Sequence, residues 1–437
     1  MSTEAATSEP QPTMEPGPTA SDTTGTARPW WRSNGYGRLL GGQAVSAVGS
    51  QITFIALPLI AVVSMGAGPG AMGLLGAVDN LPYLLIGLWV GVFVDRHARR
   101  RLMIASDALR AAAVLSVPVA ALAGWLTFAQ LCIVAFVVGI GNIVFDVACQ
   151  AQLPELVDDA HLVPANGALQ TSASMSMVAA PGLVGLLIKV VGAPVSMLID
   201  VATYLVSAGS IASIRTPEQH RPAPEASTWE QVREGWRLVL ADRRLVGLGG
   251  GTAMISLAMN ASMAVMIFFL ANRLGMDAGM IGLVFVGFGV GAAIGAMGAG
   301  ALAGRIGTGT TLLTGPLVGA AGLVLFALSG TPAAPAGWAV PLVFAGAILM
   351  AIGMMAFSSL SAGMRQLLAP EAARGKVLGT LRFVELGVMP LGSVIGGAIG
   401  QTAGAIPAVL VSALLLASTS VWVVATPLLG LRELPTG

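Results

Sequence analysis

Three stretches of this 437-residue chain, residues 39–78, 245–272 and 306–364, carry no Asp, Glu, Lys or Arg. Each reaches or exceeds the roughly 20 residues that a helix needs to cross a bilayer, and the last is long enough for two crossings. Only 10% of all residues are charged, against about a quarter in soluble domains. An outer-membrane barrel would show short segments of alternating hydrophobicity instead. The sequence therefore predicts an all-α polytopic membrane protein.

Glycines, prolines and charged clusters mark where the apolar segments end, and they predict twelve spanning helices in two sets of six. The first set covers about residues 39–64, 71–94, 102–124, 126–150, 166–189 and 193–214, and the second about 245–271, 278–303, 309–330, 337–362, 377–400 and 404–428. The predicted units are a disordered cytoplasmic tail (1–34), a six-helix bundle (35–214), a linker (215–244), a second bundle (245–430) and a C-terminal tail (431–437).

The linker and the N-terminal tail are the long polar parts of the chain. The linker ends in a run from Trp229 to Arg237 whose amphipathic pattern suits a helix on the membrane surface. The first 29 residues are rich in Thr, Pro, Ser and Ala. They lack the apolar core of a signal peptide and are typical of a disordered tail.

The segment Gly91–Arg101 places one acid and four arginines between two apolar segments. Such a cluster cannot lie in hydrocarbon, and short loops rich in Arg face the cytoplasm. With both termini cytoplasmic, only Lys189 and Arg273 of the 22 basic residues fall outside, while Arg110 and Arg382 lie within helices, which leaves 18 on the cytoplasmic side. We therefore expect a multi-pass protein of the inner (plasma) membrane with both termini inside.

The two halves of the chain share loop chemistry. Gly91–Arg96 after the second helix has a counterpart in Gly300–Arg305 after the eighth, and Gln152–Glu155 after the fourth is echoed by Gln366–Glu371 after the tenth. Internal repeats of this kind are typical of transporters whose halves rock around a site near the membrane midplane.

The charged loop resembles the signature between the second and third helices of the major facilitator superfamily. The resemblance of the chain to this family covers about residues 36–430. Further segments resemble its drug-exporter and siderophore-exporter branch, the enterobactin-exporter-like or transmembrane secretion effector group. These segments are Phe145-Asp146, Gln152–Val157, Ala165–Gly167 and Glu234–Leu245. The resemblance implies two pseudo-symmetric six-helix bundles that work by alternating access. Unlike many proton-coupled drug exporters, the chain has no arginine within the fourth helix.

The resemblance also implies a conformational gate at the charged loop. In the family the loop acid docks on the eleventh helix and a loop arginine reaches an acid of the fourth helix, for which Asp146 is a candidate here. The predicted gate residues are Gly91, Asp95, Arg96, Arg99, Arg100 and Asp146. The alternative is a loop that only anchors topology, for which Asp95 is unnecessary.

Ionisable residues inside membrane helices are costly and need a reason. Asp79 lies 16 residues before Asp95, hence about 24 Å along the helix, and burial there would let it load and release protons. A structural acid that is hydrogen-bonded to a neighbouring helix is the alternative. Arg382 and Glu385 share a helix face and form either a neutralising pair or a proton-sensitive latch.

Two further sets of charges are predicted to be structural. Asp107 and Arg110 have the same three-residue spacing as Arg382 and Glu385, which favours a static ion pair over a relay. Asp200 is expected to be structural. Proton coupling is therefore predicted at Asp79, Glu385 and Arg382.

By the resemblance, the first, fourth, seventh and tenth helices line a central cavity. The predicted lining residues are Gln43, Ser50, Asn142, Asn260, Met350, Met354 and Phe357. Methionine and phenylalanine mixed with amides and hydroxyls suit a large and mostly apolar organic molecule. An alternative is that these stripes only pack helices together.

The sequence favours a secondary active exporter, and a proton antiporter, of a hydrophobic or amphipathic molecule such as an antibiotic or secondary metabolite. A siderophore exporter of the same fold and a membrane sensor that does not transport are the alternatives. No enzyme motif, metal cluster or disulfide pattern is present, and the two cysteines lie in apolar segments. We expect a monomer without cofactors or nucleic acid, whose partners are a small-molecule substrate and the bilayer and whose energy source is the proton gradient.

Overall fold

The computed structural model describes residues 35–87, 89–158, 161–215, 228–332, 335 and 337–430. These residues form helices joined by short turns, and no strand occurs among them. Eleven helices in this part of the chain are long and apolar enough to cross a membrane. Both predicted tails, and residues 216–227 of the predicted linker, lie outside the described residues. The prediction of an all-α polytopic membrane protein is confirmed.

The first bundle is built from seven helices. They are α1 (Tyr36–Leu59), α2 (Pro69–Ile86), α3 (Val90–Asp95), α4 (Arg99–Leu122), α5 (Phe128–Leu156), α6 (Leu162–Val191) and α7 (Ala193–Ala212). The second predicted span is interrupted after Ile86, so it appears as α2 followed by the short α3. This interruption accounts for eleven long helices where the sequence predicts twelve spans.

The second bundle follows the linker helix. Its elements are α8 (Thr228–Ala241) in the linker, then α9 (Arg243–Phe268), α10 (Ala278–Ile306), α11 (Thr308–Leu328), α12 (Ala339–Leu368), α13 (Arg374–Gly387), α14 (Met389–Thr402) and α15 (Ala405–Val424). Pro390 has no N–H to bond the preceding turn, so α13 and α14 are two segments of one predicted span. The first helix of each bundle continues into a π-helical turn, Ile60–Ser64 after α1 and Phe269–Arg273 after α9.

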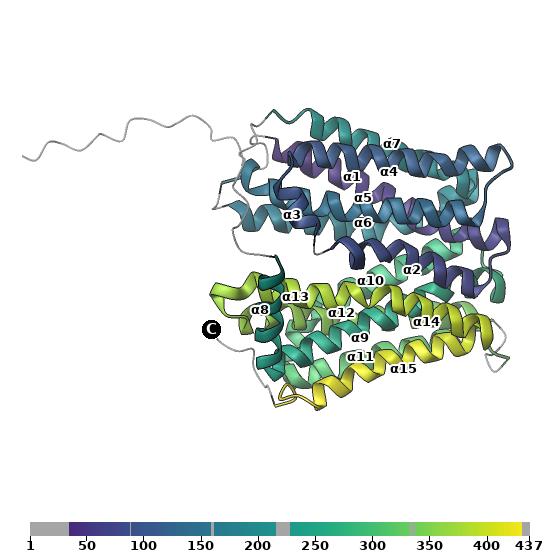
Figure 1. Cartoon of the computed structure of the whole chain (residues 1–437). Helices are drawn as coiled ribbons and strands as arrows, with labels where there is room; N and C mark the ends of the chain where they lie inside the picture. Colours follow the sequence, from purple (N-terminus) through teal and green to yellow (C-terminus); the bar gives the residue numbers. More distant parts are fainter. Residues whose placement is uncertain are drawn as a thin grey trace, which may run out of the picture.

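The two bundles lie against each other with α8 across one end (Figure 1). We call this end, which also carries residues 95–101, the loop end, and the opposite end, which carries residues 64–69 and 273–278, the far end. In the far-end half of the helices α2 packs on α14 and α6 packs on α10. A Cβ placed on Gly73 would lie 2.6 Å from the Cα of Gly397, and one on Gly282 would lie 2.9 Å from the Cα of Gly185. These helices can approach so closely only because both contact positions are glycine.

Polar contacts reinforce the far end. The Lys189 ammonium at the end of α6 forms a 2.8 Å ion pair with Asp277, which caps α10. The backbone N–H of Gly70 donates to the Gln401 side-chain oxygen at 3.2 Å. These polar and glycine contacts of α2, α6, α10 and α14 thus join the two bundles at the far end.

Candidate functional site

A cavity of about 420 Å³ lies between the two bundles, and we call it the central cavity. Most of its wall is apolar. The side chains that give it chemical character are Ser50, Phe54, Asp79, Asn80, Asn142, Tyr204, Met259, Asn260, Met263, Phe285 and Ser393. They come from α1, α2, α5 and α7 of the first bundle and from α9, α10 and α14 of the second. A cavity that draws its wall from both bundles changes shape when the bundles move relative to each other.

Asp79 is the one acid among the described residues that line the central cavity, and no Lys or Arg lines it. The carboxylate lies on α2, which the glycine contact with α14 holds in place. Asp79 is half-buried, so it faces the cavity and not the lipid. Phe54 and Phe285 face each other from opposite bundles in an edge-to-face contact with ring centroids 5.9 Å apart. The cavity therefore combines aromatic surface with one carboxylate.

Two asparagines join the bundles across this cavity. The Asn80 amide N–H₂ donates to the Asn260 side-chain oxygen at 3.3 Å and to the Gly76 carbonyl at 2.8 Å. Asn260 in turn donates to the Ser256 carbonyl at 2.9 Å. Since these bonds use the amide N–H₂ group of both residues, the carbonyl oxygen of Asn80 is left to accept from a ligand.

A buried polar network lies behind the first-bundle side of the cavity wall. Arg110 of α4 pairs with Asp107 and donates to the Asn142 side-chain oxygen at 2.8 Å. Its guanidinium lies 4.6 Å from the ring centroids of both Phe145 and Tyr204. Stacking between two rings fixes the guanidinium in one position. Asn142 is consequently oriented with its oxygen toward Arg110 and its N–H₂ group available to the cavity.

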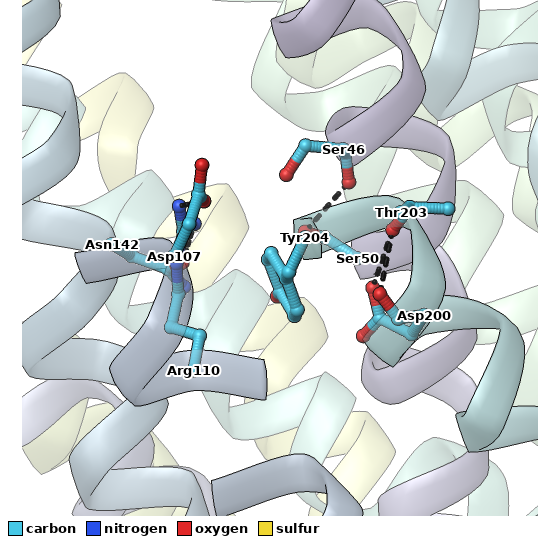
Figure 2. Close-up of polar contacts among 8 residues, drawn as sticks. All are labelled: Ser46, Ser50, Asp107, Arg110, Asn142, Asp200, Thr203 and Tyr204. Carbon is cyan, nitrogen blue, oxygen red and sulfur yellow. Dashed lines mark hydrogen bonds and ion pairs between the residues drawn. The ribbon is translucent and has the colours of Figure 1, made fainter. Parts of the chain in front are cut away.

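The network continues to α1 and α7 through Tyr204. Figure 2 shows the Tyr204 ring lying between the Arg110 group and Asp200. The Tyr204 hydroxyl is 3.1 Å from that of Ser50, and the Thr53 hydroxyl donates to the Asp200 carboxylate. Ser50, Thr53 and Tyr204 also line the central cavity. Asp200, which is fully buried, is therefore separated from the cavity by one layer of hydroxyl side chains.

A second cavity of about 460 Å³, the vestibule, lies at the loop end. Its wall includes Tyr83 and Asp146 from the first bundle, Trp236 from α8, and Arg382 and Phe383 from α13. Asp79 and Tyr83 are one turn apart on α2, and Asn142 and Asp146 are one turn apart on α5, so the two cavities are stacked along the same two helices. The vestibule leads from the loop end toward the central cavity.

The predicted pair of Arg382 and Glu385 is part of a three-residue cluster. The Glu385 carboxylate lies 3.4 Å from an Arg382 nitrogen and 3.8 Å from a nitrogen of Arg365, a buried residue of α12. Sequence spacing finds the first partner, but Arg365 comes from another helix and had no local signal. The cluster lies at the loop end of the second bundle, away from the central cavity.

Two of the loop arginines, Arg99 and Arg100, bond within the first bundle. Arg99 pairs with Glu155 at 2.6 Å and donates to the Ala151 carbonyl at 2.9 Å, so in this structure the acid that it reaches on α5 is Glu155, and a contact of the loop with Asp146 stays a prediction. Asp146 lies two turns further into the membrane, where it lines the vestibule. Arg100 donates to the Ile211 carbonyl at the end of α7 at 3.1 Å.

The remaining gate residues lie at or near the vestibule. Gly91 lines it, while Asp95 ends α3 and Arg96 is exposed. Among the described residues no hydrogen bond or ion pair joins Asp95 to α13. A gating role for this loop stays a prediction.

Three of the seven predicted cavity residues line the central cavity, namely Ser50, Asn142 and Asn260. Gln43 does not, because it lies nearer the loop end and accepts a bond from the Cys149 thiol at 3.4 Å. The α12 residues Met350, Met354 and Phe357 line neither described cavity.

The α12 stripe is instead buried inside the second bundle. Met350, Met354 and Phe357 are at most 2% exposed, and the Phe357 ring lies against Gly251 of α9. Glycine-rich neighbouring helices leave room for these large side chains, so the stripe packs within the bundle. This outcome agrees with the alternative that such stripes pack helices together.

Several lining residues carried no usable signal in the sequence. Phe54, Met259 and Phe285 are apolar residues of largely apolar helices, so periodicity alone does not distinguish them from residues that face lipid or a neighbouring helix. Tyr204 could have been found, since it lies four residues after Asp200 and a buried tyrosine hydroxyl needs a partner.

The sequence matches the transmembrane secretion effector family over residues 32–433. It is 27% identical over 414 residues to the multidrug efflux pump Tap of Mycobacterium tuberculosis, covering 89% of this chain and 92% of that protein. It is 29% identical over 188 residues to macrolide efflux protein A of Streptococcus pyogenes, a match that covers 43% of this chain and 46% of that protein. The match thus spans less than half the length of the macrolide relative.

Solved structures share the fold. A nucleoside transporter superposes with a TM-score of 0.74 at 10% identity, covering 90% of this chain and 99% of that one. A bacterial homologue of the human lysosomal transporter Spinster superposes with a TM-score of 0.67 at 16% identity, covering 91% and 96%. With the matched family, the two six-span bundles and the cavity between them, these likenesses show that the chain belongs to the transmembrane secretion effector family of major facilitator superfamily transporters and is not an enzyme.

Proposed function

We propose that this protein is a secondary active exporter of amphipathic organic molecules, driven by inward proton flow. The observation that carries the proposal is the central cavity, which is mostly apolar and holds Asp79 as its one lining charge among the described residues. An apolar wall accepts varied hydrophobic surfaces, and flexible methionines such as Met259 and Met263 adapt to irregular shapes. The names of the relatives, a multidrug pump and a macrolide efflux protein, are in line with such a cargo.

The cavity chemistry favours cargo that carries a basic amine. A carboxylate in an apolar pocket attracts a cation strongly because little water screens the charge. Phe54 and Phe285 add ring faces that also favour a cation or an aromatic group. We propose that the amine of the cargo binds Asp79, while Asn142 donates and Asn80 accepts hydrogen bonds at its polar substituents.

Transport requires access that alternates between the two membrane faces. The excess of basic residues at the loop end predicts that this end is cytoplasmic, so cargo enters through the vestibule. The far-end contacts, the Gly73–Gly397 and Gly185–Gly282 crossings, then separate while the loop end closes. Asp146 and Arg382 line the vestibule from opposite bundles. We propose that they approach each other when it closes.

Proton coupling follows if Asp79 cannot hold cargo and proton together. A proton that binds from the outer face neutralises the carboxylate and releases the amine, and loss of the proton to the cytoplasm restores the cargo site. This competition is an exchange of one cation for another at a single carboxylate.

Inside-out vesicles offer the test. A proton gradient that is acid inside should drive the uptake of erythromycin, a macrolide with one basic amine, and addition of erythromycin should partly dissipate the gradient. We expect Asp79→Asn to abolish both effects. The matched control Glu371→Gln changes an exposed acid at the loop end and should keep both. Uptake by Asp79→Asn equal to that of the unaltered protein contradicts the coupling role of Asp79.

A further inference from the structure

Asp200 is an acid in the middle of α7 that does not line the central cavity. Its side chain is fully buried. The Thr53 hydroxyl of α1 donates to one carboxyl oxygen, and the Thr203 hydroxyl lies 3.2 Å from the other. The space around it is tight, since a Cβ on Gly49 would lie 2.6 Å from the Asp200 carboxyl. The neighbours therefore supply hydroxyl groups, and no cation pairs with Asp200 among the described residues.

The buried charges of the first bundle do not balance. Its described buried charged residues are Asp107, Arg110 and Asp200, which is two acids and one base. Arg110 is committed to Asp107 by a direct ion pair. The titratable groups that interact with Asp200 are Arg110 and Asp107 on α4 and Tyr204 on α7, while α1 presents hydroxyls to it. An unpaired charge in such an interior costs several kcal/mol. A proton or another cation that binds Asp200 would cancel this negative charge.

The cavity provides a route for that cation. Thr53 both bonds Asp200 and lines the central cavity, and Ser50 and Tyr204 line the same part of the wall. A hydroxyl can accept a proton on one side while it gives one up on the other. Asp200 can thus exchange a proton with water in the cavity through one side chain, although it has no exposed surface of its own.

We propose that Asp200, with Thr53 and Thr203, is a buried proton-binding site distinct from Asp79. The inference rests on the proposed proton-driven function and deepens it, since it gives the transporter a second proton position that cargo does not touch. On release, the O–H bond of the Asp200 carboxyl breaks and its proton passes through the Thr53 hydroxyl to cavity water. The carboxylate that remains attracts Arg110, the buried cation nearest to it among the described residues.

This attraction links the site to the cargo cavity. Arg110 also holds the Asn142 oxygen, and Asn142 lines the cavity. A shift of Arg110 toward Asp200 would loosen Asn142 and strain the contact with Asp107. Protonation of Asp200 thereby favours the positions of Arg110 and Asn142 seen in the structure. Deprotonation favours an arrangement in which Arg110 has moved toward Asp200 and Asn142 is less tightly held.

The direct test is infrared difference spectroscopy of the purified full-length protein in liposomes at neutral pH and without cargo. A protonated carboxyl group has a carbonyl stretch separate from that of carboxylates, and it shifts in heavy water. We expect such a band in the unaltered protein and in Asp79→Asn, where Asp79 cannot contribute to it, and its loss when Asp200→Asn is added to Asp79→Asn. Thr53→Val should keep the band but change its frequency, because the carboxyl group loses a hydrogen bond.

Three results would overturn the proposal: no protonated carboxyl band in the unaltered protein, a band in Asp79→Asn that survives the addition of Asp200→Asn, or a band that appears only when sodium is removed. The third would mean that sodium occupies the site. Because the unaltered protein is itself informative, poor folding of Asp200→Asn does not remove the test.

A transport measurement separates this site from the proposed function. In Asp200→Asn we expect the loss of proton-driven erythromycin uptake, while exchange of labelled for unlabelled erythromycin across the membrane continues. If Asp200→Asn keeps proton-driven uptake, the Asp200 site is wrong although the exporter stands. If the unaltered protein moves no erythromycin but shows the Asp200-dependent band, the proposed cargo is wrong although the proton site stands.

Discussion

The two bundles share a fold but differ in where they keep charge. The first holds Asp107, Arg110 and Asp200 deep among its helices. In the second, the described buried charge is Arg365, which lies at the loop end beside Glu385. The second bundle fills its interior with hydroxyl pairs such as Thr252–Ser361, 3.2 Å apart, and with glycines and large apolar side chains.

This difference indicates a division of labour within a duplicated architecture. Asp79, the acid of the central cavity, also belongs to the first bundle. The second bundle contributes apolar and amide wall, including Met259, Asn260 and Phe285. We infer that the residues that bind and release protons lie in the first bundle, whereas the second bundle mainly supplies uncharged cavity wall that moves relative to the first.

The largest effect should come from breaking the buried ion pair of the first bundle. Arg110→Met leaves the Asp107 carboxylate buried without a partner, which costs about 3–5 kcal/mol of stability. The corresponding change in the second bundle, Arg365→Met, leaves Glu385 with Arg382 and should cost about 1–2 kcal/mol. Thermal unfolding of the detergent-purified proteins measures both. Adding Asp107→Asn to Arg110→Met should restore much of the loss, and equal effects in the two bundles would contradict the comparison.

The next largest effect should come from the far-end crossing. In Gly282→Leu the new side chain meets the Pro181 carbonyl, since even a Cβ would lie 2.5 Å from it. Overpacking of this kind costs about 1–3 kcal/mol, so the far end should open more often.

Cysteine labelling from the far-end side measures this opening. In a cysteine-free background with Met263→Cys in the cavity wall, Gly282→Leu should speed labelling. Gly298→Leu on the same helix is the matched control, because a Cβ there meets nothing within 4 Å. Equal labelling in both variants would rule out the far-end contact as a barrier.

A smaller effect is expected from Glu385→Gln. Glu385 lies in the loop-end cluster with Arg365 and Arg382, outside the central cavity. Its loss removes ion-pair interactions worth about 1 kcal/mol, which predicts a severalfold lower rate of erythromycin uptake with proton coupling intact. Uptake assays at several gradients test this. Complete loss of proton coupling in Glu385→Gln would show that an essential proton-binding residue lies in the second bundle.

The smallest effect belongs to the exposed pair of Lys189 and Asp277. The Lys189 ammonium lowers the pKa of Asp277 from its ordinary value. A carboxyl whose pKa is lower in the folded protein contributes stability above its unfolded pKa and loses it as pH falls through the folded value. Since both side chains are about half exposed, Asp277→Asn should cost less than about 1 kcal/mol. Thermal unfolding should show this cost at neutral pH and not in strong acid.

Much of the fold could be predicted from the sequence because its signals are local. Stretches without charge predict spans, and the arginine-rich segment at residues 95–101 predicts a break between helices, which the structure places at residues 96–98 between α3 and α4. The ion pair of Asp107 and Arg110 follows from their spacing on one helix.

What the sequence could not provide is the direction in which a helix face points. Ser50 and Asn142 face the cavity, whereas Met350 and Phe357 face glycine-rich neighbours, although all four lie on regular helical stripes. Periodicity shows that residues share a face, and only the packing of other helices decides what that face meets. The same reason explains why Arg99 reaches Glu155 and not Asp146.

In the proposed mechanism, cargo and protons move in opposite directions through one carrier. The most direct measurement uses purified protein in liposomes loaded with erythromycin, with no imposed pH gradient, while an enclosed dye reports internal pH. Outward flow of erythromycin through an antiporter should drive protons inward and acidify the lumen, and Asp79→Asn should prevent the acidification. Erythromycin efflux at the same rate without any change in internal pH would show that the protein does not exchange cargo for protons.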